Sequence, residues 1–289
     1  MVAEMGSNGI PVKAPTRLTV SDSLDFPGAW TADSKEVLFT STRNGHSQVF
    51  RQALESDNAE LIPFDFPLAT LCCVSPDGNW ILVFTTPDVS IPTAELRRVP
   101  ISGGPSQPVL KARAGMDNIA HCAAAPSKLC ALAERTPDNK ELIFTAFDPL
   151  KARGAELLRI DTSPTALYTW SMSPDGTKIA VMNPQEGRVA IHHLDGKPTT
   201  EILPKGITLG DALDWSADSK GLFIDYATKR GMALGYRDLR GNTHLVWEET
   251  AFQGAAGIAA PWGIPSRDGK HLAINGTYPS SNAWLLENF

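Results

Sequence analysis

The chain has 289 residues, a formal net charge of −6 and an isoelectric point near 5.5. Its basic pairs, such as Arg97-Arg98, are isolated, which argues against nucleic-acid binding because a phosphate backbone is bound by a basic stripe. The stretch of lowest charge, Phe252 to Pro265, is interrupted by glycine and proline. It is shorter than the roughly 18 apolar residues of a membrane span, so no span is expected.

The N-terminal residues carry no recognisable targeting signal. Residues 1–14 lack the basic start and apolar run of a signal peptide. We expect them to form a flexible arm that precedes a single domain over residues 15–289. As given, the chain would be cytoplasmic, and it would be extracytoplasmic if it is a piece of a membrane-anchored regulator.

A short motif recurs along the rest of the chain. Each copy has an apolar segment, then Ser/Thr-x-Asp-Gly/Ser, then a second apolar segment. The aspartates are Asp33, Asp77, Asp175, Asp218 and Asp268, at intervals of 44, 98, 43 and 50 residues. The double interval contains a degenerate copy between Cys122 and Cys130. Six copies with a period of roughly 43–50 residues therefore account for the chain.

The motif predicts a tight turn between two strands. Proline fixes φ, the aspartate carboxylate accepts a hydrogen bond from the backbone two residues on, and glycine takes a positive φ. We interpret the repeated aspartates as turn residues rather than metal ligands, because a ring of copies would spread them apart.

The expected strands follow in chain order. A spare strand, Arg17–Val20, precedes the first copy, and each copy has one strand before its turn. The strands expected after the turns are 37–40, 48–53, 60–64, 81–85, 95–99, 107–110, 178–182, 222–226, 234–239 and 243–247, and the last copy has 262–265, 271–274 and 282–286.

Four strands per copy are typical of a β-propeller blade. The last copy lacks a fourth strand, and a spare strand from the N-terminus would complete it and cover its edge. A solenoid, the alternative repeat architecture, would not need this closure. The predicted fold is all-β, a six-bladed β-propeller with four-stranded antiparallel blades and an N-terminal strand closing the last blade.

The repeat resembles that of TolB-like propellers, which are relatives of the WD-repeat class. The residues that carry the resemblance are Arg17-Leu-Thr, Asp25-Phe-Pro-Gly-Ala-Trp30-Thr-Ala-Asp-Ser-Lys and Phe39-Thr-Ser-Thr-Arg-Asn-Gly45. Phe144 to Lys151 and Ser281 to Phe289 are similar to C-terminal propellers of bacterial winged-helix or protein-kinase regulators. This resemblance implies the fold of residues 15–289 and says little about the ligand.

The candidate ligand site is the mouth of the central channel, where the innermost strands begin. Polar and aromatic residues near these starts are Asp25, Thr70, Asp117, Asn118, His121, Tyr168, Asp211 and Trp262. Asp25, Asp117, Asn118 and Asp211 could supply oxygen ligands to Ca²⁺, as in lactonase-type propellers. The simpler interpretation is a solvated rim with capped turns and no cofactor.

Two cysteines flank the degenerate third turn. Cys122 and Cys130 would lie on facing strands of one hairpin, where a cross-strand disulfide needs some adjustment of the backbone. The alternative is two buried thiols that pack as small apolar residues. A disulfide would indicate an oxidising compartment.

No hydrolase, nucleotide or zinc motif occurs, including G-x-S-x-G. His192 and His193 are adjacent and would point to opposite faces of a strand, so they cannot share one ion. Trp30 and Trp215 occupy equivalent places, which favours packing between blades.

The sequence therefore favours a non-enzymatic interaction platform, and the resemblance implies the sensor part of a bacterial signalling or regulatory protein. We expect a monomer with a protein or peptide partner, and a small ligand is also compatible. The alternatives are a calcium-assisted hydrolase or lyase at the channel mouth and a purely structural subunit.

Overall fold

A computed structural model describes residues 1–6, 9–21, 23–65, 70–85, 93–113, 120–202, 207–250 and 261–276, with only the backbone described at 70–72 and 250. All regular elements in these ranges are strands. No helix in the described ranges could therefore cross a bilayer.

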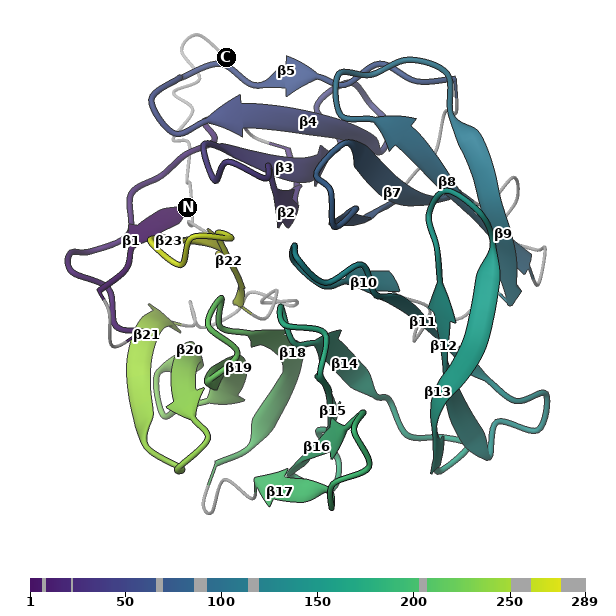
Figure 1. Cartoon of the computed structure of the whole chain (residues 1–289). Coiled ribbons are helices and arrows are strands. Elements are labelled where there is room, and N and C mark those ends of the chain that lie inside the picture. The colour runs from purple at the N-terminus through teal and green to yellow at the C-terminus, as the bar shows by residue number, and fades with distance from the viewer. Residues whose placement is uncertain are drawn as a thin grey trace, which may run out of the picture.

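The strands form six antiparallel sheets arranged as blades around a ring (Figure 1). Blade 1 contains β2 (Asp25–Trp30), β3 (Glu36–Ser41), β4 (Gln48–Ala53) and β5 (Glu60–Leu61). Blade 2 contains β6 (Thr70–Val74), β7 (Trp80–Thr85), β8 (Thr93–Pro100) and β9 (Gln107–Arg113). Blade 3 contains β10 (Ala120–Cys122), β11 (Cys130–Arg135), β12 (Glu141–Phe147) and β13 (Arg153–Asp161).

The remaining three blades complete the ring. Blade 4 contains β14 (Thr169–Met172), β15 (Lys178–Asn183), β16 (Arg188–His193) and β17 (Thr200–Ile202). Blade 5 contains β18 (Leu209–Trp215), β19 (Gly221–Ala227), β20 (Gly231–Asp238) and β21 (Thr243–Thr250). Blade 6 contains β22 (Trp262–Pro265), β23 (His271–Asn275) and β1 (Val2–Glu4), in the spatial order β1-β23-β22. The predicted six-bladed, all-β architecture is confirmed.

The strand that closes the ring differs from the predicted one. β1 pairs with β23, with Val2 opposite Ala273 and Ala3 opposite Leu272. Arg17–Val20 forms no strand, and its Arg17 side chain instead donates to the nearby carbonyl oxygens of Thr19 and Ser21. The closing strand thus lies within the residues expected to form a flexible arm. The expected strand at 282–286 lies outside the described residues.

Alternation of small apolar side chains explains why Val2–Glu4 can close the ring. Successive side chains of a strand point to opposite faces. Val2 packs with Trp30 of blade 1, whereas Ala3 packs with Phe223 of blade 5. The short segment therefore fills the gaps on both sides of blade 6, which the charged and polar Arg17–Val20 could not do.

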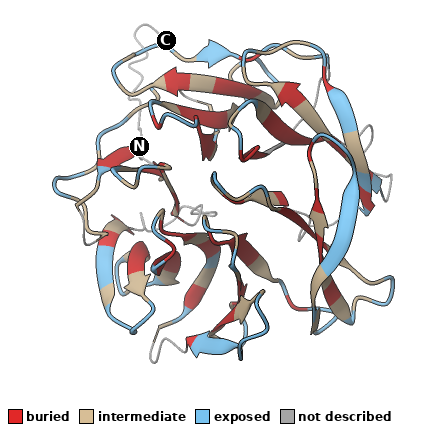
Figure 2. Cartoon of the chain, viewed as in Figure 1, coloured by how far each residue is buried: buried red, intermediate tan, exposed pale blue. Residues whose placement is uncertain are grey.

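The core consists of six apolar clusters, one at each junction between neighbouring blades. Each cluster joins residues of exactly two blades: 1 and 2, 2 and 3, 3 and 4, 4 and 5, 5 and 6, and 6 and 1. Figure 2 shows the buried residues in the inner strands, while the outer strand β13 is mostly exposed. Blade stacking thus holds the ring together.

Two tryptophans add hydrogen bonds across these junctions. The Trp30 indole Nε1–H donates to the carbonyl oxygen of Ile264 at 2.9 Å, from blade 1 to blade 6. Trp215 makes the equivalent bond to Ser171 at 3.1 Å, from blade 5 to blade 4. The predicted role of these residues in blade packing is confirmed.

The repeated aspartates act as turn residues. In five turns a Ser or Thr hydroxyl donates to the carboxylate of the Asp two residues later, at 2.5–2.7 Å. Gly78, Gly176 and Gly269 follow with positive φ, and Ser34 and Ser219 take the same conformation in the two Asp-Ser copies. Each of these two serine hydroxyls also accepts a hydrogen bond from the backbone N–H of the repeated aspartate in the preceding blade.

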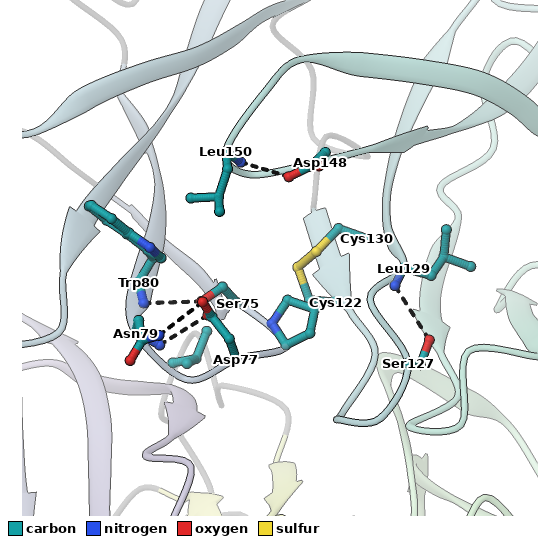
Figure 3. The surroundings of a disulfide bond; sticks show 12 residues. Ser75, Asp77, Asn79, Trp80, Cys122, Ser127, Leu129, Cys130, Asp148 and Leu150 are labelled. Carbon is teal, nitrogen blue, oxygen red and sulfur yellow. Dashed lines mark hydrogen bonds between the residues drawn. A yellow bond between two sulfur atoms is a disulfide. The ribbon is translucent and has the colours of Figure 1, made fainter.

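Cys122 and Cys130 face each other in the third blade. They are directly opposed in the β10–β11 pairing, and their Sγ atoms are bonded (Figure 3). Cys130 is fully buried against the junction with blade 2. The disulfide therefore ties the hairpin that has lost the Asp-Gly turn.

We expect loss of this disulfide to lower the free energy of unfolding by about 2–3 kcal/mol, because it closes a loop of only eight residues. Urea denaturation of Cys130→Ala measures this, with Cys73→Ala as the control for loss of a buried sulfur. An unchanged unfolding midpoint after full reduction of the native protein would contradict the prediction.

Candidate functional site

The ring has two different ends. At one end, which we call the entrance face, the inner strands β2, β6, β10, β14, β18 and β22 begin. At the other, the turn face, lie the Ser/Thr-x-Asp turns. The predicted site residues belong to the entrance face. Among them, Asp117 and Asn118 lie outside the described residues, as does the side chain of Thr70.

Asp25 is held by an ion pair inside its own blade. Its carboxylate oxygens lie 3.1 and 3.2 Å from Nη2 of Arg43, and both side chains are largely buried. The Arg43 guanidinium in turn lies over the rings of Phe39 and Phe50, 5.1 and 4.6 Å from their centroids. Asp25 is therefore already neutralised by a fixed cation.

His121 is a packing residue. Its ring meets the Trp170 indole edge-on, with centroids 4.7 Å apart. Burial lowers the pKa of His121 to about 4, although a hydrogen bond to the Trp170 backbone opposes the shift. The imidazole is thus neutral at pH 7 and bridges blades 3 and 4.

Asp211 is exposed on a bulge at the start of β18. Its backbone carbonyl accepts a hydrogen bond from the Thr169 hydroxyl at 2.7 Å, which joins the inner strands of blades 4 and 5. The bulge interrupts the register of β18 and β19 between Leu209 and Leu213. The Asp211 side chain therefore remains at the rim, available to solvent or a partner.

Asp225 supports this bulge, and sequence reasoning missed it. It is fully buried in β19, and its Oδ1 accepts a hydrogen bond from the Ala212 backbone N–H at 2.8 Å. A Cβ on Gly210 would lie 1.8 Å from Oδ2, so only glycine fits there. Burial raises the pKa of Asp225 to about 7. The signal in the sequence was an acidic residue inside the otherwise apolar run of β19.

Tyr168 and Trp262 lie in different environments. Tyr168 precedes β14 and lines a pocket of about 430 Å³ between blades 3 and 4. Trp262 is half-buried against the junction of blades 6 and 1. Each predicted site residue whose side chain is described thus contacts its own blade or a neighbouring blade, and these residues do not form a single site.

The metal alternative has little support in the described ranges. They contain no group of three or more His, Cys, Asp or Glu side chains that could hold a metal ion. Since Asp117 and Asn118 lie outside these ranges, the calcium site stays a prediction.

The turn face is filled by contacts between turns. The backbone N–H of Ala124 in blade 3 donates to the carbonyl oxygen of Pro174 in blade 4 at 2.8 Å. The Asp175 N–H donates to the Ser219 hydroxyl of blade 5 at 3.2 Å. The Asp268 N–H donates to the Ser34 hydroxyl of blade 1 at 3.1 Å. The Arg267 guanidinium crosses from blade 6 to blade 2 and donates to the carbonyl oxygens of Ser75 at 2.8 Å and Pro76 at 3.1 Å. The turns therefore form a connected layer at this end.

Arg267→Met is expected to lower the free energy of unfolding by about 2–3 kcal/mol, because it leaves two carbonyl acceptors without their charged donor. Urea denaturation measures the loss. Arg240→Met, at an exposed turn, is the matched control and should change stability little. Equal losses in the two variants would show that the crossing bonds do not stabilise the ring.

The entrance face carries exposed apolar side chains beside Asp25. Leu24 and Phe26 are 65% and 40% exposed, and they flank Asp25 in the chain where β2 begins. We call them the apolar rim. A single exposed apolar residue is common, whereas two that flank the acid of a largely buried ion pair are a candidate contact surface.

The chain is similar to known proteins in its three-dimensional structure. No family model matches the chain, and no curated protein matches it in sequence. A protein of Agrobacterium tumefaciens described as a candidate TolB matches with a TM-score of 0.67 and 17% identity, over 90% of this chain and 92% of that one. TolB of Acinetobacter baumannii matches with a TM-score of 0.58 and 19% identity, over 85% of this chain and 59% of that one.

A chain from a complex of nidogen and laminin is also similar, with a TM-score of 0.54 and 12% identity, over 75% of this chain and 77% of that one. Together with the six blades, these matches show that the chain has the TolB-like propeller fold. The narrower likeness to propellers of bacterial regulators stays a prediction.

Proposed function

We propose that this propeller is a non-enzymatic binding platform whose protein or peptide partner docks on the entrance face. The observation that carries the proposal is the difference between the two ends of the ring. On the turn face, the described Ser/Thr-x-Asp turns are joined to one another by hydrogen bonds, whereas on the entrance face Leu24 and Phe26 are exposed beside Asp25.

The chemistry of the apolar rim suits a protein contact. Interface cores are enriched in aromatic and arginine side chains. Phe26 lies next to Asp25, whose partner Arg43 is held against two phenylalanine rings. A rigid arginine surrounded by apolar side chains loses little conformational entropy on binding. One of the similar structures was solved as a protein–protein complex, which is compatible with this role.

Site-specific photocrosslinking tests the proposal. A photoreactive amino acid at position 26 should capture a discrete partner, whereas the same group at the exposed position 35 of the turn face should not. The purified partner should then bind the native protein and lose affinity about 10–100-fold for Leu24→Asp. Equal capture at both positions, or unchanged affinity of Leu24→Asp, would contradict it.

The enzymatic alternative has a separate test. Asp25 is one of the four predicted ligands of a calcium-assisted hydrolase or lyase, and its pairing with Arg43 opposes that role. Turnover of a lactone or ester panel that requires Ca²⁺ and is lost in Asp211→Asn would replace the platform proposal. A sensory role within a larger signalling protein is part of our proposal and rests on the sequence resemblance alone.

A further inference from the structure

We propose that the pocket between blades 3 and 4 binds a small molecule that carries both an ammonium group and a carbonyl oxygen, as amino acids and peptide amino termini do. The pocket is lined by residues of β13, β15 and β16 and of the segments that join strands at the entrance face, where β13 and β15 end and β14 and β16 begin. It is separate from the apolar rim of blade 1, so either proposal can fail alone.

Two buried hydrogen-bond donors in the lining have no partner among the described residues, and they indicate where a ligand's acceptor atom would bind. Asn183 is only 4% exposed, and its Oδ1 accepts hydrogen bonds from the backbone N–H groups of Gln185 and Glu186 at 3.1 and 3.2 Å. These bonds fix the amide, and its Nδ2 has no hydrogen-bond partner among the described residues. A buried donor of this kind calls for an acceptor such as a carbonyl oxygen.

Arg188 supplies the second donor. Its Nε is buried and likewise has no partner in the described part of the chain. The other nitrogens of the guanidinium reach Glu201 at 2.7 Å and Glu186 at 3.7 Å. The charge of Arg188 is therefore balanced while its Nε–H remains unpaired, and Asn183 and Arg188 both line the pocket.

Charge identifies the ammonium side. The pocket is lined by two arginines, Arg159 and Arg188, and by two acids, Asp161 and Glu186. Arg159 is already paired with Glu141 at 2.7 Å and Glu156 at 2.8 Å, and Arg188 with Glu201. The Arg135 guanidinium also lies over the ring of Tyr168. The lining and its charged neighbours thus carry five carboxylates and three guanidinium groups, an excess of negative charge that disfavours a plain anion and favours a ligand with a positive group.

The remaining lining residues are uncharged or apolar. His192 is half-buried, and burial together with Arg188 lowers its pKa, so the ring is neutral at pH 7. Val181, Ile160 and the ring of Tyr168 give apolar contacts for a side chain. The volume of about 430 Å³ lies in the lower part of the range of small-molecule sites.

Calorimetric titration with four probes tests the proposal. L-Leucine and L-leucinamide carry both groups, N-acetyl-L-leucinamide lacks the ammonium group, and isoamylamine lacks the carbonyl oxygen. We expect leucine or leucinamide to bind one per chain, and each single-function probe to bind at least about tenfold more weakly. Binding of leucinamide without binding of leucine would identify peptide amino termini as the source, and the reverse would identify free amino acids.

Two variants separate the two sides of the pocket. Asn183→Ser removes the amide donor but keeps a hydroxyl acceptor for the turn, and Asp161→Asn removes one exposed charge. Each should weaken binding about tenfold, with melting temperatures showing that the variants are folded. Asn44→Ser and Asp57→Asn are the controls in blade 1. Failure of all four probes at millimolar concentration, or equal binding by variants and controls, would overturn the proposal.

Discussion

Ala3→Asp is expected to lower the free energy of unfolding by about 4 kcal/mol or more, a large part of the roughly 5–15 kcal/mol that stabilises a typical domain. Ala3 is fully buried in β1, where it packs with Phe223, Leu234 and Leu272. The substitution places a carboxylate in an apolar junction, and the ring depends on this strand to join blades 5, 6 and 1. Urea denaturation followed by tryptophan fluorescence measures the change.

A matched substitution in the same segment separates ring closure from a general effect of charge. Ala14→Asp adds the same carboxylate at an exposed position eleven residues later and should leave stability within about 0.5 kcal/mol. A folded, native-like Ala3→Asp protein would show that β1 does not hold the ring closed.

Asp225→Asn is expected to become more stable than the native protein as the pH rises. Burial raises the pKa of Asp225 from 3.8 to about 7. A raised carboxyl pKa stabilises the fold at low pH, and this contribution is lost as the pH rises from about 4 through 7. The shift corresponds to about 4 kcal/mol at pH 8. Asparagine keeps the Oδ1 acceptor for Ala212 and carries no charge, so it avoids this loss.

Other groups titrate in the same range, so the measured quantity is the difference between variant and native protein. Burial also raises the pKa of Asp214 to about 6, in the same direction. The lowered pKa of His121 acts in the opposite sense, because a charged imidazole would destabilise the fold at low pH. Both remain in the variant and cancel in the comparison. Urea denaturation at pH 5 and pH 8 gives the difference, and Asp57→Asn is the exposed control. A constant difference at the two pH values would show that Asp225 is ionised throughout.

The candidate site was less accessible to sequence reasoning than the fold. The starts of the inner strands were located correctly for Asp25 and Asp211, but the role of each side chain depends on residues far along the chain. Arg43 lies eighteen residues after its partner Asp25. Asn183 and Arg188 form a pocket with Arg159 and Asp161 of the preceding blade. Such pairings follow from blade stacking, and no local pattern contains them.

Local chemistry determined the repeating unit. A turn requires a Ser or Thr hydroxyl, an aspartate and a residue with positive φ at fixed positions, so the sequence alone predicted the turns, the strands around them, the number of blades and the packing of Trp30 and Trp215. Closure of the ring was different. Arg17–Val20 and Val2–Glu4 are both short segments near the N-terminus. Only Val2–Glu4 has small apolar side chains on both faces, which the gap between blades 5 and 1 requires. The choice of closing strand, the crossing of Arg267 and the buried carboxyl of Asp225 were decided by contacts between distant segments, because burial and hydrogen bonding depend on what the folded ring brings together.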